Sequence, residues 1–395
     1  MKRLLKISLD TLLGSVFPII TWLVLSIILD KNLINVFGLT FPLQFVGWVM
    51  GVIFGAGANI HKERDGNKNA VMSGLFLGSA VGLIVFGFLI FNVDLYLVFM
   101  NVEVEIYREF TIYAMLQMYI SMIFGCILDK LYFEGKNSKA NKYSLLYNII
   151  SFSSVVLFAL ILDNKLHIVI LASLVRAGCA VLIGTRVFEK FKLKINILKY
   201  IKYISHTVVR LLMLFIVFLI GYKNAFAFGE EYIIGLTFIG LITDVQWDII
   251  ITAISAAAEI DLAKRRFNYR EHLKNGYKLC ALVVTSILIL AVCLWNFYDI
   301  PAAFVVVIII LDIYALLLYP LCGINSCFLQ LEYSAKKNTA NQFVMSLMRI
   351  VCAFFRTPYN STIGQIIGTT YILLSTTIML KRNFVLDESG ELLRR

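Results

Sequence analysis

Long runs of apolar residues, separated by short polar stretches, follow one another along the whole chain. A helix that crosses a bilayer needs about 20 mostly apolar residues, because each residue adds about 1.5 Å and the hydrocarbon core is about 30 Å thick. The pattern therefore predicts twelve membrane-spanning helices. Their expected ranges are 9–29, 35–58, 70–92, 108–129, 143–162, 166–185, 205–222, 232–258, 277–297, 302–326, 341–357 and 361–380.

The composition of the chain excludes several other classes of protein. Hydrophobic residues make up 60% of the 395 residues and charged residues 15%, with a mean hydropathy of +0.83. An ordinary soluble domain has roughly 45–50% apolar and about 25% charged residues. These values exclude a soluble fold, a disordered or collagen-like chain, a disulfide scaffold and a nucleic-acid-binding module. We expect an all-α integral membrane protein whose partner is the lipid bilayer.

The chain lacks the common motifs of enzyme chemistry. It has no HExxH, no GxxxxGK and no glycine-rich dinucleotide turn. Its seven cysteines lie in or next to apolar stretches without a CxxC, which favours buried small side chains over disulfides or metal ligands. We therefore predict no enzyme activity, no cofactor and no ATP as the energy source.

The positive charges fall on alternate sides of the predicted topology. Of the 36 lysines and arginines, 28 lie in the two tails and in the loops that follow even-numbered helices. Because cytoplasmic segments carry the excess of Lys and Arg, both termini are predicted to be cytoplasmic, in an inner-membrane protein. One missed or added helix would have moved every later loop to the other side, so this alternation supports a count of twelve.

Two offsets indicate an internal repeat. A shift of 201 residues aligns 126–138 with 327–339 at Cys, Leu, Tyr, Lys and Asn positions, and a shift of 200 aligns 56–60 with 256–260 at Ala and Ile positions. The alternative is chance similarity among Leu- and Ala-rich helices. Both offsets correspond to six helices, which predicts two parallel six-helix bundles around a central cleft. The expected amino-terminal lobe is 1–188, the cytoplasmic linker 189–204 and the carboxyl-terminal lobe 205–395.

Three short segments carry a family resemblance. The small-residue stretch 51–60 and the loop 66–70 resemble the end of the second helix and the following loop of the multidrug and toxic compound extrusion (MATE) family, and Glu134-Gly135-Lys136-Asn137-Ser138 is similar to that family's short loop after the fourth helix. The resemblance, or one to a close relative in its flippase superfamily, implies a secondary transporter of small molecules driven by a proton or sodium gradient. Gly51, Gly55 and Gly57 are expected to serve helix packing rather than to bind ligands.

Ionisable residues inside predicted spans mark the candidate site, because each costs about 2.5 to 3.5 kcal/mol at the centre of a membrane helix. The eighth helix carries a polar stripe at spacings of 7, 4, 4, 3 and 4 residues, with Gln246 and Trp247 beside it. At about 3.6 residues per turn the stripe lies on one face, which must meet a wet cavity or partner helices. Its members are Thr237, Asp244, Asp248, Thr252, Ser255 and Glu259.

Asp244 and Asp248 lie one helical turn apart, so their charges repel. This pair would hold a proton, or a sodium ion with Thr252 or Ser255 as additional ligands. Asp312 is a third acid for cation coupling, as the resemblance implies. The alternative is that the three acids only neutralise the buried bases Arg210 and Arg349.

Basic and aromatic residues complete the predicted cavity lining, which comprises Thr252, Ser255, Arg210, Arg176 and Trp247. Arg176 either faces the central cleft and meets an anionic substrate or pairs with Asp129. Other aromatic residues, Tyr319 among them, are expected mainly to pack helices.

Together these features predict a cation-coupled antiporter, a monomer that exports small amphipathic or cationic organic molecules by alternating access. A flippase for a lipid-linked saccharide or similar amphiphile is the alternative, and a membrane enzyme or receptor is the third candidate.

Overall fold

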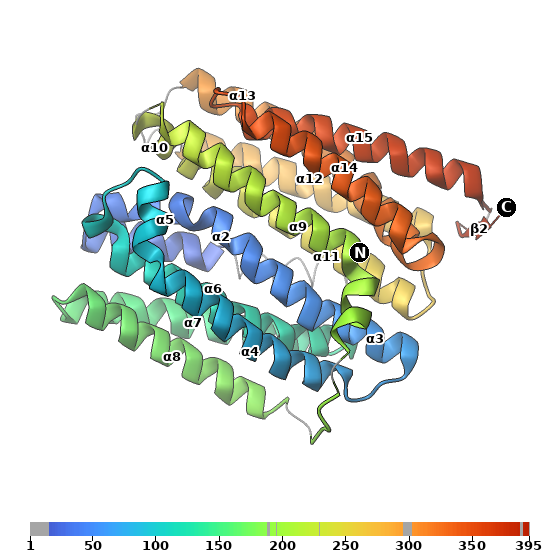
Figure 1. Ribbon diagram of the computed structural model, residues 1–395, viewed down its shortest axis with the longest axis horizontal. Coiled ribbons are helices and arrows are strands. Elements are labelled where there is room, and N and C mark those ends of the chain that lie inside the picture. Colours follow the sequence, from blue (N-terminus) through green and yellow to red (C-terminus); the bar gives the residue numbers. More distant parts are fainter. Residues whose placement is uncertain are drawn as a thin grey trace. The chain divides into compact units, whose positions relative to one another are not determined.

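Helices make up nearly all of the computed structural model, which describes residues 16–187, 190–194, 196–228, 230–294, 302–387 and 390–394 (Figure 1). Nine helices within these ranges are long and apolar enough to cross a membrane, and a shorter apolar helix covers Val16–Ile28. Large apolar side chains point away from the protein interior, such as Phe91, which is 91% exposed, and Ile27, which is 84% exposed. Such faces suit lipid rather than water. The prediction of an all-α membrane protein is confirmed, and the count of twelve helices stays a prediction.

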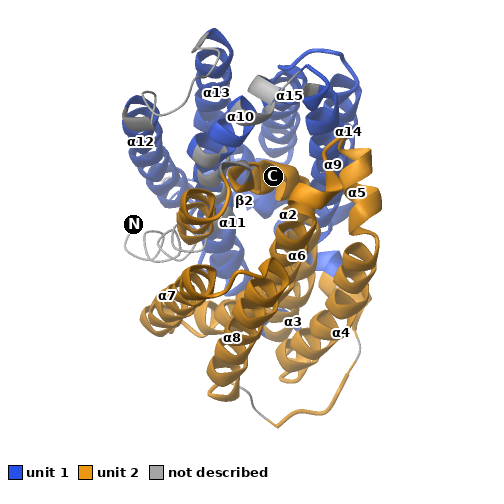
Figure 2. Cartoon of the chain, turned by 90° about the vertical axis from the view of Figure 1, so that its left-hand side faces the viewer, with its two compact units in different colours: residues 1–12, 63–65, 201–395 blue, residues 13–62, 66–200 orange. Residues whose placement is uncertain are grey.

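The chain divides into two compact units, drawn in different colours in Figure 2. Among the described residues, unit 2 contains 16–62 and 66–200, and unit 1 contains 63–65 and 201–394. The predicted two-lobe repeat and its boundaries stay predictions.

Unit 2 is organised around one central helix, α6, against which α2, α4, α5, α7 and α8 all pack. Its long helices run alongside one another (Figure 1). The elements are η1 (Lys31–Ile34), α2 (Asn35–Gly51), the π-helix η2 (Val52–Gly57), α3 (Ala58–Asp65), α4 (Ala70–Phe91), α5 (Val93–Phe99), α6 (Val104–Phe133), α7 (Asn137–Ile161) and α8 (Lys165–Thr185).

Unit 1 is organised around α13, which packs against α10, α11, α12 and α15. Its elements are α9 (Ile197–Phe226), α10 (Glu230–Ile239), the π-helix η3 (Gly240–Asp244), α11 (Val245–Ala263), α12 (Tyr269–Leu294), α13 (Ala302–Phe328), the π-helix η5 (Leu329–Tyr333), α14 (Ala335–Ala353) and α15 (Asn360–Asn383).

Several helices extend beyond their predicted ends into polar sequence, because hydropathy marks only the part of a helix that is apolar. The fourth predicted helix ends at 129, whereas α6 continues to Phe133. The seventh was predicted from 205, and α9 begins at Ile197 with a break in helical backbone angles at Ile204. Part of the predicted linker is therefore helical, and the predicted start coincides with the kink.

A short hairpin follows the last helix and was not predicted. Strands β1 (Phe384–Leu386) and β2 (Leu392–Arg394) pair antiparallel, with Phe384 opposite Arg394. Phe384 packs into a buried cluster with Phe328 and Leu262, from α13 and α11. The backbone N–H of Tyr269 donates to the carbonyl of Gly390 at 3.0 Å, which ties the hairpin to the start of α12.

Candidate functional site

Gly55, which belongs to one of the segments that carry the family resemblance, packs closely against α6 within unit 2. Gly55, in η2, lies so close to α6 that a Cβ atom there would collide with the Asp129 carboxylate. Asn59 donates from Nδ2 to the Gly55 carbonyl at 2.9 Å. This close contact agrees with the expectation that Gly55 allows two helices to pack closely.

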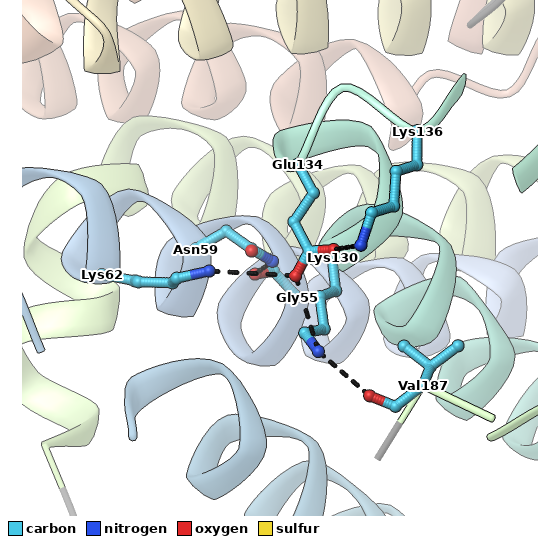
Figure 3. Close-up of polar contacts among 7 residues, drawn as sticks. All are labelled: Gly55, Asn59, Lys62, Lys130, Glu134, Lys136 and Val187. Carbon is cyan, nitrogen blue, oxygen red and sulfur yellow. Dashed lines mark hydrogen bonds and ion pairs between the residues drawn. The ribbon is translucent and has the colours of Figure 1, made fainter. Parts of the chain in front are cut away.

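A cluster of charges lies beside this contact, centred on Glu134 (Figure 3). Glu134 lies 2.8 Å from Lys136 Nζ, 3.5 Å from Lys130 Nζ and 4.0 Å from Lys62 Nζ. Lys130 is buried, and its ammonium also donates to the Val187 carbonyl at 3.0 Å. One carboxylate thus connects the end of α6, the segment after it and α3. We refer to Lys62, Lys130, Glu134 and Lys136 as the Glu134 cluster.

The electrostatics of Glu134 reflect two opposing effects. Partial burial acts to raise the pKa of its carboxyl, while the hydrogen bond from Lys136 and the positive charges of Lys130, Lys136 and Lys62 act to lower it. The positive charges prevail, and the pKa of Glu134 is lowered. Sequence reasoning placed Lys130 in a loop; the i,i+4 spacing of Lys130 and Glu134 could have indicated this pair.

Arg176 has neutral partners in unit 2. It is buried in α8, and it donates from Nε to Tyr147 Oη at 2.7 Å and from Nη2 to Ser121 Oγ at 2.6 Å. Its guanidinium also lies 4.9 Å from the centre of the Tyr147 ring, which stacks on Phe124. Arg176 therefore connects α8 with α6 and α7 through hydroxyl groups.

Three predicted cavity residues meet at Tyr319 in unit 1. Arg210 donates from Nη1 to Tyr319 Oη at 3.2 Å, and Ser255 Oγ lies 3.1 Å from the same oxygen. The Trp247 ring packs edge-on against the Tyr319 ring at 5.8 Å, and its Nε1 is buried without a hydrogen-bond partner. Helices α9, α11 and α13 each contribute to this group. We refer to Arg210, Trp247, Ser255 and Tyr319 as the Tyr319 cluster.

Asp312, near the middle of α13, is 4% exposed and accepts a hydrogen bond from Thr243 Oγ1 at 2.7 Å. Thr243 lies in η3, one residue before Asp244. The side chains of Asp244, Asp248 and Thr252 lie outside the described part of the structure, although their helices are described. The proposed pairing of the two aspartates therefore stays a prediction.

The polar stripe differs from its prediction in its backbone geometry. The prediction assumed an uninterrupted α-helix from Thr237 to Glu259, but η3 adds π-helical backbone between α10 and α11. A π-helix has more residues per turn than an α-helix, so it changes the face on which later residues lie. Glu259, the last residue of the stripe, is only 7% exposed. Cys327 Sγ, from α13, lies 4.0 Å from Glu259 Oε1.

Arg349 is a buried base in α14, and it donates from Nη2 to Gln365 Oε1 at 3.4 Å. Cation binding by the acids stays a prediction, as does its alternative, the neutralisation of Arg210 and Arg349.

Comparison with known proteins gives matches at the level of structure. No family model matches the sequence, and no curated protein matches it. The structure is similar to that of a MOP superfamily transporter from Pyrococcus furiosus, for which the reverse polarity of the binding pocket is said to suggest a different function (TM-score 0.74, 16% identity, 96% of this chain and 95% of that chain).

Two further structures are similar over nearly the whole chain. One is an outward-facing multidrug resistance MATE family transporter of the MOP superfamily, with a TM-score of 0.74, 16% identity and coverage of 96% of this chain and 94% of that chain. The other is MATE in complex with MaD5, with a TM-score of 0.71, 16% identity and 96% of both chains covered. These neighbours are transporters and not enzymes. The resemblance inferred from the sequence is confirmed for the fold: the chain folds as the MATE and MOP superfamily transporters do.

Proposed function

We propose that the protein is a secondary transporter that uses a proton or sodium gradient to export small amphipathic or cationic organic molecules. The fold shared with MATE transporters supports transport across a membrane. The cargo, the coupling ion, the monomeric state, the inner-membrane location and the cytoplasmic termini are part of the proposal. In this mechanism two lobes expose a central cavity to one side of the membrane and then to the other.

The observation that carries the proposal is the burial of Asp312. A carboxyl group in the middle of an apolar helix costs about 2.5 to 3.5 kcal/mol on insertion scales, so such residues commonly have a function. Asp312 also has a hydroxyl partner in Thr243. A carboxylate with a neutral oxygen beside it can accept a proton, or bind sodium with that oxygen as a second ligand.

Asp244 and Asp248 extend this site in the proposal. They follow Thr243 closely in the chain, and η3 ends at Asp244. π-helical segments occur frequently at functional sites, because the wider turn frees backbone groups and redirects side chains. Cation binding by these acids would favour one conformation of the lobe, and cation release would favour the other.

One observation favours the flippase alternative. Arg176 is buried, and the hydroxyl groups of Tyr147 and Ser121 that accept its hydrogen bonds are neutral. A guanidinium held by neutral groups retains its positive charge for an anionic headgroup, such as a pyrophosphate.

Transport into vesicles distinguishes the two functions. Proteoliposomes containing the purified protein would be given a pH gradient or a sodium gradient separately, and uptake of a fluorescent lipophilic cation would be measured. We expect uptake to require one of the two gradients. Uptake of the cation at the same rate with and without each gradient would contradict ion coupling. Scrambling of a fluorescent lipid without either gradient would support the flippase instead.

A further inference from the structure

Three side chains with metal-binding atoms converge inside unit 1, and Asp244, Asp248 and Asp312 are not among them. His206 comes from α9, Glu259 from α11 and Cys327 from α13. Their ligand atoms all lie within 4.8 Å of one another. The three residues are 3%, 7% and 1% exposed, so water does not compete freely for these atoms.

One potential metal-binding atom in this group, His206 Nδ1, has no hydrogen-bond partner. His206 Nε2 lies 3.1 Å from Thr207 Oγ1, while its Nδ1 is buried without a hydrogen-bond partner. Cys327 Sγ lies 4.0 Å from Glu259 Oε1, a long contact even for sulfur. Burying a polar nitrogen without a partner is costly, so native proteins usually satisfy such an atom. With Nε2–H donating to Thr207, the lone pair of Nδ1 is the free one.

We propose that His206, Glu259 and Cys327 bind a divalent transition metal of the zinc type. Imidazole nitrogen, carboxylate oxygen and thiolate sulfur are the ligands that Zn²⁺ takes, at about 2.0 to 2.3 Å. Ligand atoms in a tetrahedron of that size are roughly 3.3 to 3.8 Å apart. The 4.8 Å spread therefore closes with side-chain adjustments on the order of 1 Å. The hydroxyl of Thr207 would hold the imidazole in place from the other side, as outer partners of metal-bound histidines commonly do.

The charges balance in this assignment. Zn²⁺ replaces the proton of the Cys327 thiol, so the ion, the thiolate and the Glu259 carboxylate sum to zero. Arg210, one helical turn after His206, keeps its positive charge and is held by Tyr319. Three protein ligands leave a fourth coordination position, and the nearby guanidinium favours an anion there. This site is independent of the proposed transport activity and of Asp312.

Cobalt titration tests the proposal in the purified full-length protein without a polyhistidine tag. Co²⁺ bound to a thiolate gives a charge-transfer absorption in the near ultraviolet. We expect this band to saturate at one Co²⁺ per chain and to disappear when Zn²⁺ is added. In Cys327→Ser the band should be absent. His206→Gln and Glu259→Gln should weaken Zn²⁺ binding by roughly tenfold or more, since even outer-shell changes cost about 10- to 100-fold.

Cys322→Ser is the matched control, because Cys322 is also a buried thiol on α13 but its Sγ contacts the Thr369 carbonyl. This variant should keep the cobalt band. If a variant does not fold, the cobalt titration of the wild-type protein still tests the proposal. Absence of the band from the wild type, a band that Zn²⁺ does not displace, or a band that persists in Cys327→Ser would overturn the proposal.

Discussion

At the scale of single residues, the Glu134 cluster links charge to stability. Because three lysines lower the pKa of Glu134, its carboxylate is more stable in the folded protein than in the unfolded chain. The folded-state pKa is below the unfolded one, so this stabilisation is present above the unfolded pKa, about 4.3 for Glu, and is lost as the pH falls through the folded value.

Glu134→Gln should therefore lower the melting temperature in detergent at pH 7, because buried Lys130 loses its carboxylate partner at a cost of about 1–3 kcal/mol. The difference from wild type should shrink as the pH falls to about 4 and below. Glu63→Gln is the control: Glu63 is exposed, and its loss should change stability by less than about 0.5 kcal/mol. A melting difference that does not depend on pH would contradict the electrostatic explanation.

Individual site residues could be predicted from the sequence, but their partners could not. Arg210 and Ser255 were singled out because polar or charged groups are costly in an apolar span, and Trp247 because it lies beside the polar stripe. Their meeting point, Tyr319, lies 109 residues after Arg210 and looks in the sequence like any packing aromatic. The proximity of His206, Glu259 and Cys327 could not be predicted for the same reason, because the three residues are far apart in the sequence.

At the scale of helices, small residues determine how closely α4 approaches its neighbours. A Cβ atom on Gly74 would lie 2.7 Å from the Phe54 carbonyl oxygen and 2.8 Å from Ala58 Cβ. Backbone atoms cannot rotate away as a flexible side chain can. Gly74→Ala should therefore destabilise the protein by about 1–3 kcal/mol, the usual cost of overpacking.

Gly87→Ala on the same helix is the matched control, because a Cβ atom there meets nothing within 4 Å. It should be neutral or stabilising by up to about 1 kcal/mol, since alanine favours the helix over glycine. Melting temperatures in detergent and SDS unfolding midpoints would measure both effects. Equal behaviour of the two variants would show that close packing at Gly74 is not limiting.

The contact between α8 and its neighbours depends on Arg176. Tyr147→Phe removes the hydroxyl that accepts from Nε and leaves the ring, so the buried guanidinium loses a hydrogen bond. We expect a loss of about 1.5–3 kcal/mol in unfolding free energy, the range for hydrogen bonds to charged groups. Tyr143→Phe, four residues earlier on α7, should be nearly neutral. A loss of the same size in both variants would argue against a specific role of the Arg176 contact.

The helices themselves were predictable because apolar length is a strong signal, whereas their irregularities were not. Hydropathy cannot distinguish an α-helical turn from a π-helical one, so the π-helices η2, η3 and η5 were not predicted. The hairpin after α15 was missed because its polar, charged sequence resembles a tail. Its anchor, Phe384, is a single aromatic residue whose partners come from distant helices.

At the scale of the whole molecule, the distribution of charge predicts the orientation in the membrane. Asn92→Cys, after α4, should react with an impermeant maleimide from outside intact cells, and Lys190→Cys only after the cells are opened. The six native cysteines whose side chains the structure describes are buried, so the background should be low. Labelling of Lys190→Cys in intact cells would reverse the orientation, because positive residues would then face the outside.

The last prediction concerns the coupling site. Asp312 lies ten residues after Ala302, so about 15 Å into α13 and half-way across a hydrocarbon core of about 30 Å. Asparagine keeps most of the shape of the carboxyl group and its contact with Thr243, but it cannot take up a proton and offers sodium no charge. Asp312→Asn should therefore remain folded and lose gradient-driven efflux, while Asp30→Asn, beyond the end of the helix Val16–Ile28, should retain it. Efflux from proteoliposomes and melting temperature would be measured for both variants. Retained efflux with Asp312→Asn and lost efflux with Asp30→Asn would move the coupling site to the amino-terminal lobe.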